Sequence, residues 1–126
     1  MSYINWFPLD QRSQDGLTII VDKTWEDMDP ADCFDTSIDP STNKPYFDVE
    51  QMRKDIDAGD LDWFILRARV LLDDLELGRS IVGGFLYKDA EEVLTDGTAD
   101  DLIAEALHEA RNRAVKLKLQ LEELGI

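Results

Sequence analysis

The rarest reactive side chains in the sequence are one histidine, His108, and one cysteine, Cys33. A zinc site built from histidine or cysteine needs three or four ligands, so these two residues are too few to hold the metal. A cysteine–histidine nucleophile pair needs only these two, but no surrounding motif supports one. We therefore expect His108 to lie on the surface or against its own helix, and Cys33 to be a loop residue without catalytic chemistry.

Carboxylates are far more numerous, and a cluster that starts at Asp55 has a spacing that suggests calcium. In an EF-hand, loop position six is glycine and position twelve is glutamate. Counted from Asp55, these positions hold Asp60 and Leu66, so the pattern is not met. An earlier acidic cluster is equally unspecific for a hard cation and consists of Asp27, Asp29, Asp32 and Asp35. We interpret both clusters as solvated acidic surface and predict no bound metal and no cofactor.

Other catalytic patterns are weak or absent. Two carboxylates can act as the acid and the base of a glycosidase, but among 28 acidic residues such pairs arise by chance. Gly83 and Gly84 lie in a strand-like pattern and lack the lysine and the serine or threonine of a phosphate-binding loop. The sequence contains no Gly-x-Ser-x-Gly motif. These residues predict a protein that is not an enzyme.

The balance of charge narrows the class of partner. The chain has 28 acidic and 13 basic side chains and a formal net charge of −15. Contacts to phosphates need lysine and arginine, so direct binding to nucleic acid or to an anionic membrane is disfavoured. A protein with a basic surface is the partner that this charge attracts and steers.

The acidic residues concentrate in two stretches. Residues 22–62 carry 13 acidic and 4 basic side chains, and residues 89–109 carry eight acidic side chains and no basic one. In the second stretch Asp101, Glu105 and Glu109 recur every four residues and so share one face of a helix. Spaced carboxylates can imitate nucleic-acid phosphates, although many ordinary proteins are equally acidic. The residues predicted to contact a partner are Asp27, Asp29, Asp32, Asp35, Asp55, Asp57, Asp60, Glu91, Glu92, Asp101, Glu105 and Glu109.

The clearest structural signal is a β-hairpin over residues 63–87. Its first half places apolar side chains at alternate positions, which is typical of a half-buried strand. Asp73 and Asp74 form the predicted turn. In the returning strand, Gly78 and the Gly83–Gly84 pair are predicted bulge or bend points.

The region before this hairpin is less regular. A turn at Asp15–Gly16 precedes a short buried strand over residues 17–21. Residues 22–46 hold three of the four prolines and are predicted to form a long loop with one helical turn near Pro30–Phe34. A short helix is predicted over residues 48–58. The side chains expected to hold the loop against the body are Trp25, Phe34, Ile38 and Tyr46.

The C-terminal part is helical. A short helix is predicted over residues 88–97, and a long one begins at the capping-box-like pair Thr98 and Asp101 and stops at Gly125. Apolar residues recur along the long helix at alternating spacings of four and three; this seam consists of Ile103, Leu107, Ala110, Ala114, Leu117, Leu121 and Leu124. Such a seam is typical of a two-stranded coiled coil or of a helix laid on a sheet. Its two alanines favour packing on the sheet.

Length and cysteine content limit the organisation of the chain. A chain of 126 residues has the usual size of one domain, so a single domain is predicted over residues 1–126. A lone thiol fits a reducing cytoplasm, and the first 13 residues lack the pattern of a signal peptide. No apolar run approaches the roughly 20 residues that span a bilayer. The predicted location is therefore the cytoplasm.

Residues 63–113 combine a strand, a tight acidic turn, an L-x-L-G return strand with paired glycines, and an E-A-x-x-E-A-R helix. The letters are WFILRARVLLDDLELGRSIVGGFLY, followed by EALHEAR. This pattern resembles the C-terminal part of small accessory proteins of phages and mobile elements. Proteins of that setting include acidic anti-CRISPR and anti-restriction proteins, so the resemblance implies antagonism of host defence in the cytoplasm of the host cell. It implies no site residues.

Together these observations predict an α+β domain. A small antiparallel sheet contains the 63–87 hairpin and is packed by the long C-terminal helix. The predicted function is to bind and inhibit a nucleic-acid-binding protein or complex through an acidic surface that imitates nucleic acid. The alternative is an adaptor or assembly module that binds a protein through apolar surface around Trp25, Trp63 and the sheet. A monomer and a homodimer are both compatible with the sequence.

Overall fold

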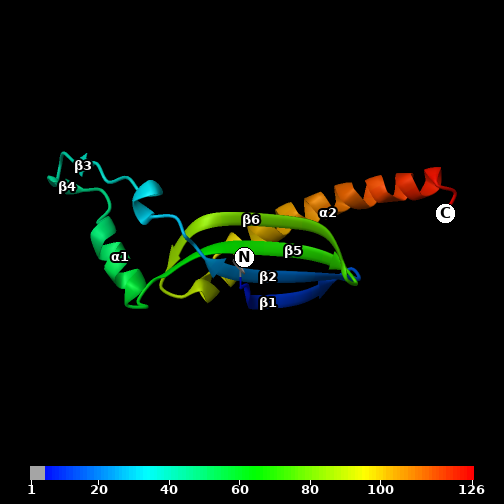
Figure 1. Ribbon diagram of the computed structural model, residues 1–126, viewed down its shortest axis with the longest axis horizontal. Coiled ribbons are helices and arrows are strands. Elements are labelled where there is room, and N and C mark those ends of the chain that lie inside the picture. The colour runs from blue at the N-terminus through cyan, green and yellow to red at the C-terminus, as the bar shows by residue number, and fades with distance from the viewer. Residues whose placement is uncertain (1–4) are drawn as a thin grey trace.

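A four-stranded antiparallel sheet and one long helix form the body of the protein (Figure 1). The computed structural model describes residues 5–126. Residues 1–4 belong to the N-terminal segment in which no signal peptide is predicted, and they lie outside the described range. The helix is α2 (Thr98–Glu123). The strands, in their order across the sheet, are β1 (Phe7–Gln14), β2 (Leu17–Trp25), β5 (Asp62–Leu72) and β6 (Leu75–Tyr87). The predicted α+β fold, with its hairpin and long C-terminal helix, is confirmed.

A smaller unit, which we call the insert, joins β2 to β5 and consists of residues 26–61. It lies beyond one end of the sheet (Figure 1). The region predicted as a loop therefore has structure of its own. Its elements are the 3-10 helix η1 (Pro30–Asp32), the two-stranded hairpin of β3 (Ile38–Asp39) and β4 (Lys44–Pro45), and the helix α1 (Val49–Asp57).

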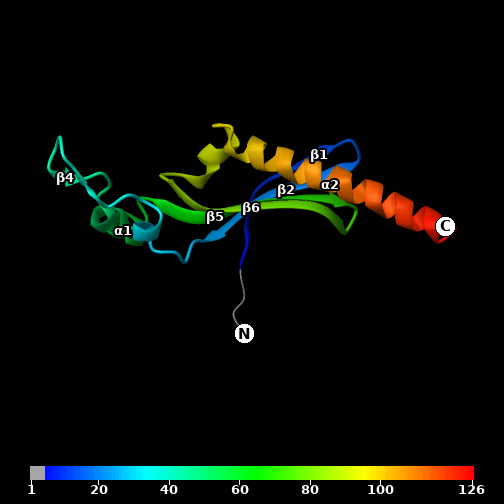
Figure 2. The ribbon, with the colours of Figure 1, turned by 90° about the horizontal axis from the view of Figure 1, so that it is seen from above.

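The sheet has one covered face and one open face. Figure 2 shows α2 crossing the covered face of the sheet. A second 3-10 helix, η2 (Ala90–Leu94), connects β6 to α2. η2 and the insert lie at the same end of the sheet. The insert leads into Asp62, the first residue of β5, and η2 comes after Tyr87, the last residue of β6, and these two residues pair in the sheet.

The hairpin turns use residues that tolerate a left-handed backbone. Asp15 and Gly16 have φ angles of 53° and 81°, and a two-residue type I′ turn requires positive φ at both positions. Asp73 has a φ angle of 53° in the second turn. The register of β6 shifts between its contacts with Phe64 and Leu66, and Gly84 adopts a φ of 78° there. The predicted turns and this bend are confirmed.

The hydrophobic core lies between the covered face and α2. Alternate residues of β5, from Phe64 to Val70, are at most 1% exposed. Each large apolar side chain that is buried in this way contributes about 1.5–3 kcal/mol. The residues that α2 buries all belong to its first half and are Ala99, Leu102, Ile103, Ala106, Leu107 and Ala110.

Helix and sheet approach each other most closely at Gly78 of β6. A methyl group at Gly78 would overlap the carbonyl oxygen of Ala106 and lie 2.8 Å from the amide nitrogen of Ala110. Only a hydrogen atom fits in this space. The small residues Ala106 and Ala110 therefore allow the first half of α2 to pack closely on the sheet. This agrees with the prediction that was based on the alanines of the seam, of which Ala110 lies in this half.

The seam is used only in part within the chain. Ile103, Leu107 and Ala110 are buried, but no later residue of α2 is. The rest of the helix projects past the end of the sheet in both Figure 1 and Figure 2. Packing on the sheet thus accounts for the first half of the seam and for part of Leu117, and it leaves Ala114, Leu121 and Leu124 exposed.

Several predicted boundaries are wrong. β1 has no counterpart among the predicted elements, and β2 continues to Trp25 instead of ending at residue 21. The predicted helix over residues 88–97 is the five-residue 3-10 helix η2. Thr98 is not a capping residue, because Gly97 holds the cap position and the Asp96 carboxylate accepts the hydrogen bond from the Thr98 amide at 2.9 Å.

Candidate protein-binding surfaces

Three contacts attach the insert to the sheet. The indole nitrogen of Trp63 on β5 donates a hydrogen bond to the Met28 carbonyl oxygen at 2.8 Å. The ring of Phe34 packs against that of Trp63 with 5.9 Å between their centroids. The Glu26 carboxylate accepts a hydrogen bond from the Gly84 amide of β6 at 2.9 Å. The insert is therefore held to both strands of the central hairpin.

Only one of the four side chains predicted to hold this region does so. Phe34 packs inward, but Trp25, Ile38 and Tyr46 are 65%, 54% and 51% exposed. The main anchor is Trp63, which is 4% exposed. The prediction that Trp63 belongs to an exposed apolar binding surface is therefore wrong, because the insert covers its ring. Trp25 is exposed and can still contact a partner.

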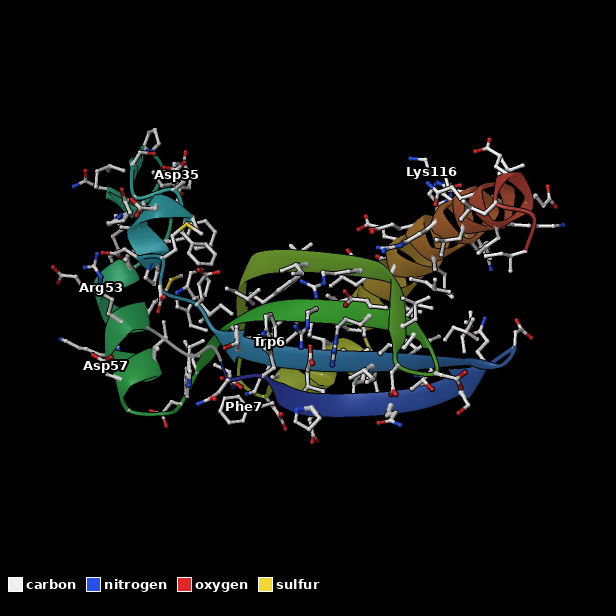
Figure 3. The ribbon with its side chains drawn as sticks, turned by 45° about the vertical axis from the view of Figure 1, so that its right-hand side comes forward. Trp6, Phe7, Asp35, Arg53, Asp57 and Lys116 are labelled. Atoms are coloured by element: carbon white, nitrogen blue, oxygen red, sulfur yellow. The ribbon has the colours of Figure 1, made fainter. Side chains whose placement is uncertain are left out.

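The insert carries more than half of the net charge of the protein. Its residues 26–61 include eleven acidic and three basic side chains, a formal net charge of −8 out of −15. Figure 3 shows Asp57 and Arg53 on α1 directed away from the sheet. Five of the predicted partner-contacting carboxylates of the insert are exposed and form no ion pair within residues 5–126; they are Asp27, Asp32, Asp35, Asp57 and Asp60.

Local hydrogen bonds keep other carboxylates of the insert ionised. Asp29 accepts hydrogen bonds from the Ala31 amide and from the Arg53 guanidinium, and both lower its pKa below the ordinary 3.8. Asp35 and Asp39 each accept from the hydroxyl and the amide of the serine two residues later, which also lowers their pKa. Asp29, Asp35 and Asp39 therefore keep their negative charge in mildly acidic solution. Separately, the half-buried Asp55 accepts a hydrogen bond from the Gln51 side chain at 2.9 Å.

Acidification is expected to loosen these turns only well below neutral pH. Because folding lowers the pKa of Asp29, Asp35 and Asp39, their contribution to stability is complete above the unfolded-state value of about 3.9 and is lost as pH falls through the folded value. The amide proton shifts of Ala31 and Ser37 should titrate with midpoints below pH 3.8 in an NMR series. Midpoints at or above that value would contradict the hydrogen-bonded turns.

The second acidic group lies on η2 and the first half of α2. Glu91, Glu92, Asp101 and Glu109 are exposed, and none of them forms an ion pair with another described residue. Glu105 differs, because its carboxylate accepts a hydrogen bond at 2.7 Å from the hydroxyl of Ser80 on β6. The predicted stripe on α2 is therefore not uniform, since Glu105 also links the helix to the sheet.

The charge is distributed unevenly along the length of the molecule. The insert and η2 follow the same end of the sheet, and α2 then runs to the opposite end. There the sign reverses, because residues 110–121 include four basic side chains and no acidic one. Figure 3 shows the two extremes, with Asp57 on the insert and Lys116 near the end of α2. One end of the molecule is thus acidic and the other locally basic.

The open face of the sheet holds a buried ion pair that the sequence did not predict. Arg67 of β5 donates hydrogen bonds to both carboxylate oxygens of Asp22 on β2, at 2.8 and 2.6 Å. The Trp6 ring covers the guanidinium at 3.8 Å, and Arg69 lies 3.4 Å from the same carboxylate. Asp22 and Arg67 are 3% and 8% exposed. The only sequence signal is the alternation that puts both arginines on one face, since Asp22 falls in the predicted loop.

The residues first considered for chemistry occupy different elements. His108 is exposed on α2, where its Nε2 lies 3.4 Å from the side-chain nitrogen of Asn112. Cys33 is exposed in the insert, and its sulfur lies 3.3 Å from that of Met28. Among the described residues, no three side chains of the metal-ligating types converge on one point. No helix in residues 5–126 is long and apolar enough to cross a membrane.

The protein presents three candidate binding surfaces: the acidic insert, the acidic group on η2 and α2, and the exposed apolar residues around Trp25. No protein-family model, no curated protein and no solved structure matches the chain significantly.

Proposed function

We propose that the protein binds and inhibits a nucleic-acid-binding protein or complex. The insert and the acidic residues of η2 and α2 would occupy the basic surface on which the target holds DNA or RNA. Inhibition is stoichiometric, because occupation of the surface excludes the nucleic acid. The protein needs no catalytic group, metal or cofactor for this role.

The supporting observation is the insert, which carries a formal net charge of −8 and is held to β5 and β6 by Trp63 and Glu26. An attached acidic surface loses little conformational freedom when it binds, so more of its electrostatic attraction remains as affinity. Its five exposed, predicted carboxylates outside ion pairs would contact lysine and arginine side chains of the target. Such contacts speed association and weaken as salt is added.

The proposal extends to the kind of target. Residues 63–113 resemble accessory proteins of phages and mobile elements, among which acidic antagonists of CRISPR and restriction complexes occur. CRISPR effector complexes hold nucleic acid in positively charged channels. A CRISPR or restriction complex is therefore the target class that the proposal favours.

Neutralising the free carboxylates of the insert tests the proposal. A variant with Asp27→Asn, Asp57→Asn and Asp60→Asn is expected to bind its target about threefold to 150-fold more weakly, because exposed charge pairs contribute roughly 0.2–1 kcal/mol each. The control neutralises a carboxylate in the hairpin turn at the opposite end of the sheet, through Asp15→Asn.

The measurement is capture of partners from a nuclease-treated bacterial lysate at low and at high salt, followed by mass spectrometry. The proposal predicts that the wild type and the control enrich a nucleic-acid-binding complex at low salt only, and that the insert variant does not. Equal capture by all three proteins would remove the insert from the binding surface.

A second candidate function is an adaptor that binds through apolar surface, and the exposure of Trp25 favours it. Trp25 is 65% exposed and borders a pocket of about 180 Å³ with the partly exposed Phe7. The same capture experiment separates the two functions. An adaptor predicts capture that resists salt and is lost in Trp25→Ala, whereas the inhibitor predicts that Trp25→Ala still captures the target at low salt.

A further inference from the structure

Apart from Leu117, which packs partly against the core, the last part of α2 is exposed and is not covered by other residues of the described range 5–126. We call residues 111–126 the overhang, and it projects beyond the sheet in Figures 1 and 2. Two apolar stripes run along it. Ala114, Leu117 and Leu121 continue the face that packs on the sheet, while Val115 and Leu119 lie about 160–200° away from Leu117 at 100° per residue. Val115 and Leu119 are 61% and 54% exposed.

A groove separates the overhang from the tip of the β5–β6 hairpin. It has a volume of about 490 Å³. Leu72, Leu75 and Leu77 line it from the hairpin, and Ala114, Leu117 and Leu121 line it from the helix. Leu72 and Leu75 are 46% and 48% exposed. The lining is mainly apolar, although Lys118 and Glu122 also border the groove. Leu77 belongs to the core and Leu117 packs partly against it, whereas Leu72, Leu75 and Leu121 are exposed.

An occupant of this groove must be apolar on two opposite sides, because it meets the hairpin on one side and the helix on the other. A helix with apolar residues on opposite faces is normally buried on both. The overhang is itself such a helix. We propose that the occupant is the overhang of a second copy of this chain, so that two molecules insert their overhangs into each other's grooves about a two-fold axis.

This arrangement gives the exposed residues Leu72, Leu75, Val115, Leu119 and Leu121 a partner. The four elements stack in the order hairpin tip, partner overhang, overhang, partner hairpin tip. The two overhangs meet antiparallel through the stripe of Leu117 and Leu121. The opposite stripe of Val115 and Leu119 then meets Leu72 and Leu75 of the other copy. A single two-fold contact closes, so the assembly stops at a dimer.

The charges in this region are complementary in the same arrangement. The rim of the groove at the hairpin turn is acidic, with Asp73 and Asp74 exposed and outside every ion pair among the described residues. The inserted helix is basic and brings its four cationic side chains, of which Lys116 and Lys118 lie in the middle of the overhang. Antiparallel pairing also places Arg111 of one copy opposite the acidic end of the other.

The size of the contact suits a stable dimer. The helical part of the overhang runs from Arg111 to Glu123, which is about 20 Å at 1.5 Å per residue. A helix of that length and roughly 12 Å diameter that is half buried contributes about 400 Å². The hairpin tip, which meets one side of the inserted helix, adds about 200 Å², so about 600 Å² is buried per copy and about 1,200 Å² in total, the lower end of the range for a specific interface.

The molar mass in solution tests the dimer. Size-exclusion chromatography with light scattering of the full chain is expected to give twice the chain mass at micromolar concentration. Leu119→Glu and Leu121→Glu should each shift the dissociation constant upward by at least about a hundredfold and yield monomer. Ala104→Glu adds the same charge on an exposed position of α2 over the sheet and should leave the dimer intact. Circular dichroism should show all three variants folded, because these positions lie outside the core.

Two outcomes would overturn the proposal. A wild-type protein that stays monomeric at 100 micromolar or so would leave the groove to a different protein. A dimer that persists in both overhang variants would use another surface. A charge pair across the interface gives an independent readout: Lys118→Glu should weaken the dimer, and Lys118→Glu combined with Asp73→Lys and Asp74→Lys should restore it. Failure of this rescue would contradict the placement of the overhang against the partner's turn.

Discussion

Replacing Arg67 with alanine is expected to lower the free energy of unfolding by about 3–5 kcal/mol, because the change leaves a buried carboxylate without its main partner. Asp22 is 3% exposed, and the nearest remaining cation is Arg69 at 3.4 Å. The change also removes the guanidinium that lies beneath the Trp6 ring. Urea unfolding followed by circular dichroism measures the loss.

The neighbouring strand offers a matched control. Arg79 on β6 also donates two hydrogen bonds to one carboxylate, that of Glu76, but its side chain is 45% exposed. Exposed pairs contribute at most about 1 kcal/mol, so Arg79→Ala should cost little. Equal losses in the two variants would show that the burial of Asp22 is not what makes Arg67 important.

Replacing Gly78 with alanine is expected to cost about 3 kcal/mol or more, at the upper end for overpacking, and to lower the melting temperature by roughly 10 °C. The added methyl group would overlap the Ala106 carbonyl oxygen, and backbone cannot rotate away as a side chain can. The strain is relieved only if α2 moves off the sheet, which opens the core around Leu107. Thermal unfolding measured by circular dichroism tests the effect.

The control for this variant is the same change five residues later. At Gly83 an added methyl group would meet the end of the Glu26 side chain, which is flexible. Moving that side chain sacrifices its hydrogen bond to the Gly84 amide, which costs about 1 kcal/mol. If Gly83→Ala destabilised the protein as much as Gly78→Ala, close contact between helix and sheet would not be the cause.

The elements that the sequence predicted correctly are those with local signals. The β5–β6 hairpin combines alternating apolar residues with a turn at Asp73, and α1 has a capping carboxylate at Asp48 that accepts a hydrogen bond from the Gln51 amide. The first half of α2 follows its apolar seam. In each case the residues that specify the element lie within a few turns or one hairpin of one another, so a single sequence contains the whole pattern.

The missed elements depend on contacts between distant residues. β1 is a polar edge strand with the sequence FPLDQRSQ, and it has no alternation because only part of its covered side reaches the core. β2 continues through Asp22 and Lys23 only because Arg67 and Asp62 on β5 neutralise them. Without knowledge of the pairing register, these charged residues are typical of a loop.

The candidate site could be predicted as a region but not residue by residue. Counting charges identifies the acidic stretches directly. Which carboxylates already serve the fold depends on long-range contacts, such as those between Asp29 and Arg53 or between Glu105 and Ser80. The exchange of roles between Trp25 and Trp63 has the same origin, because only the folded insert covers Trp63.

The most direct test of the account is a competition measurement on the target complex obtained by capture. Fluorescence anisotropy follows labelled DNA or RNA on that complex as the protein is added at several salt concentrations. The account predicts displacement of the nucleic acid at one protein per binding site, with an affinity that falls steadily as salt rises and that is lost in the insert variant. A ternary complex that retains the nucleic acid, with an affinity independent of salt, would contradict it.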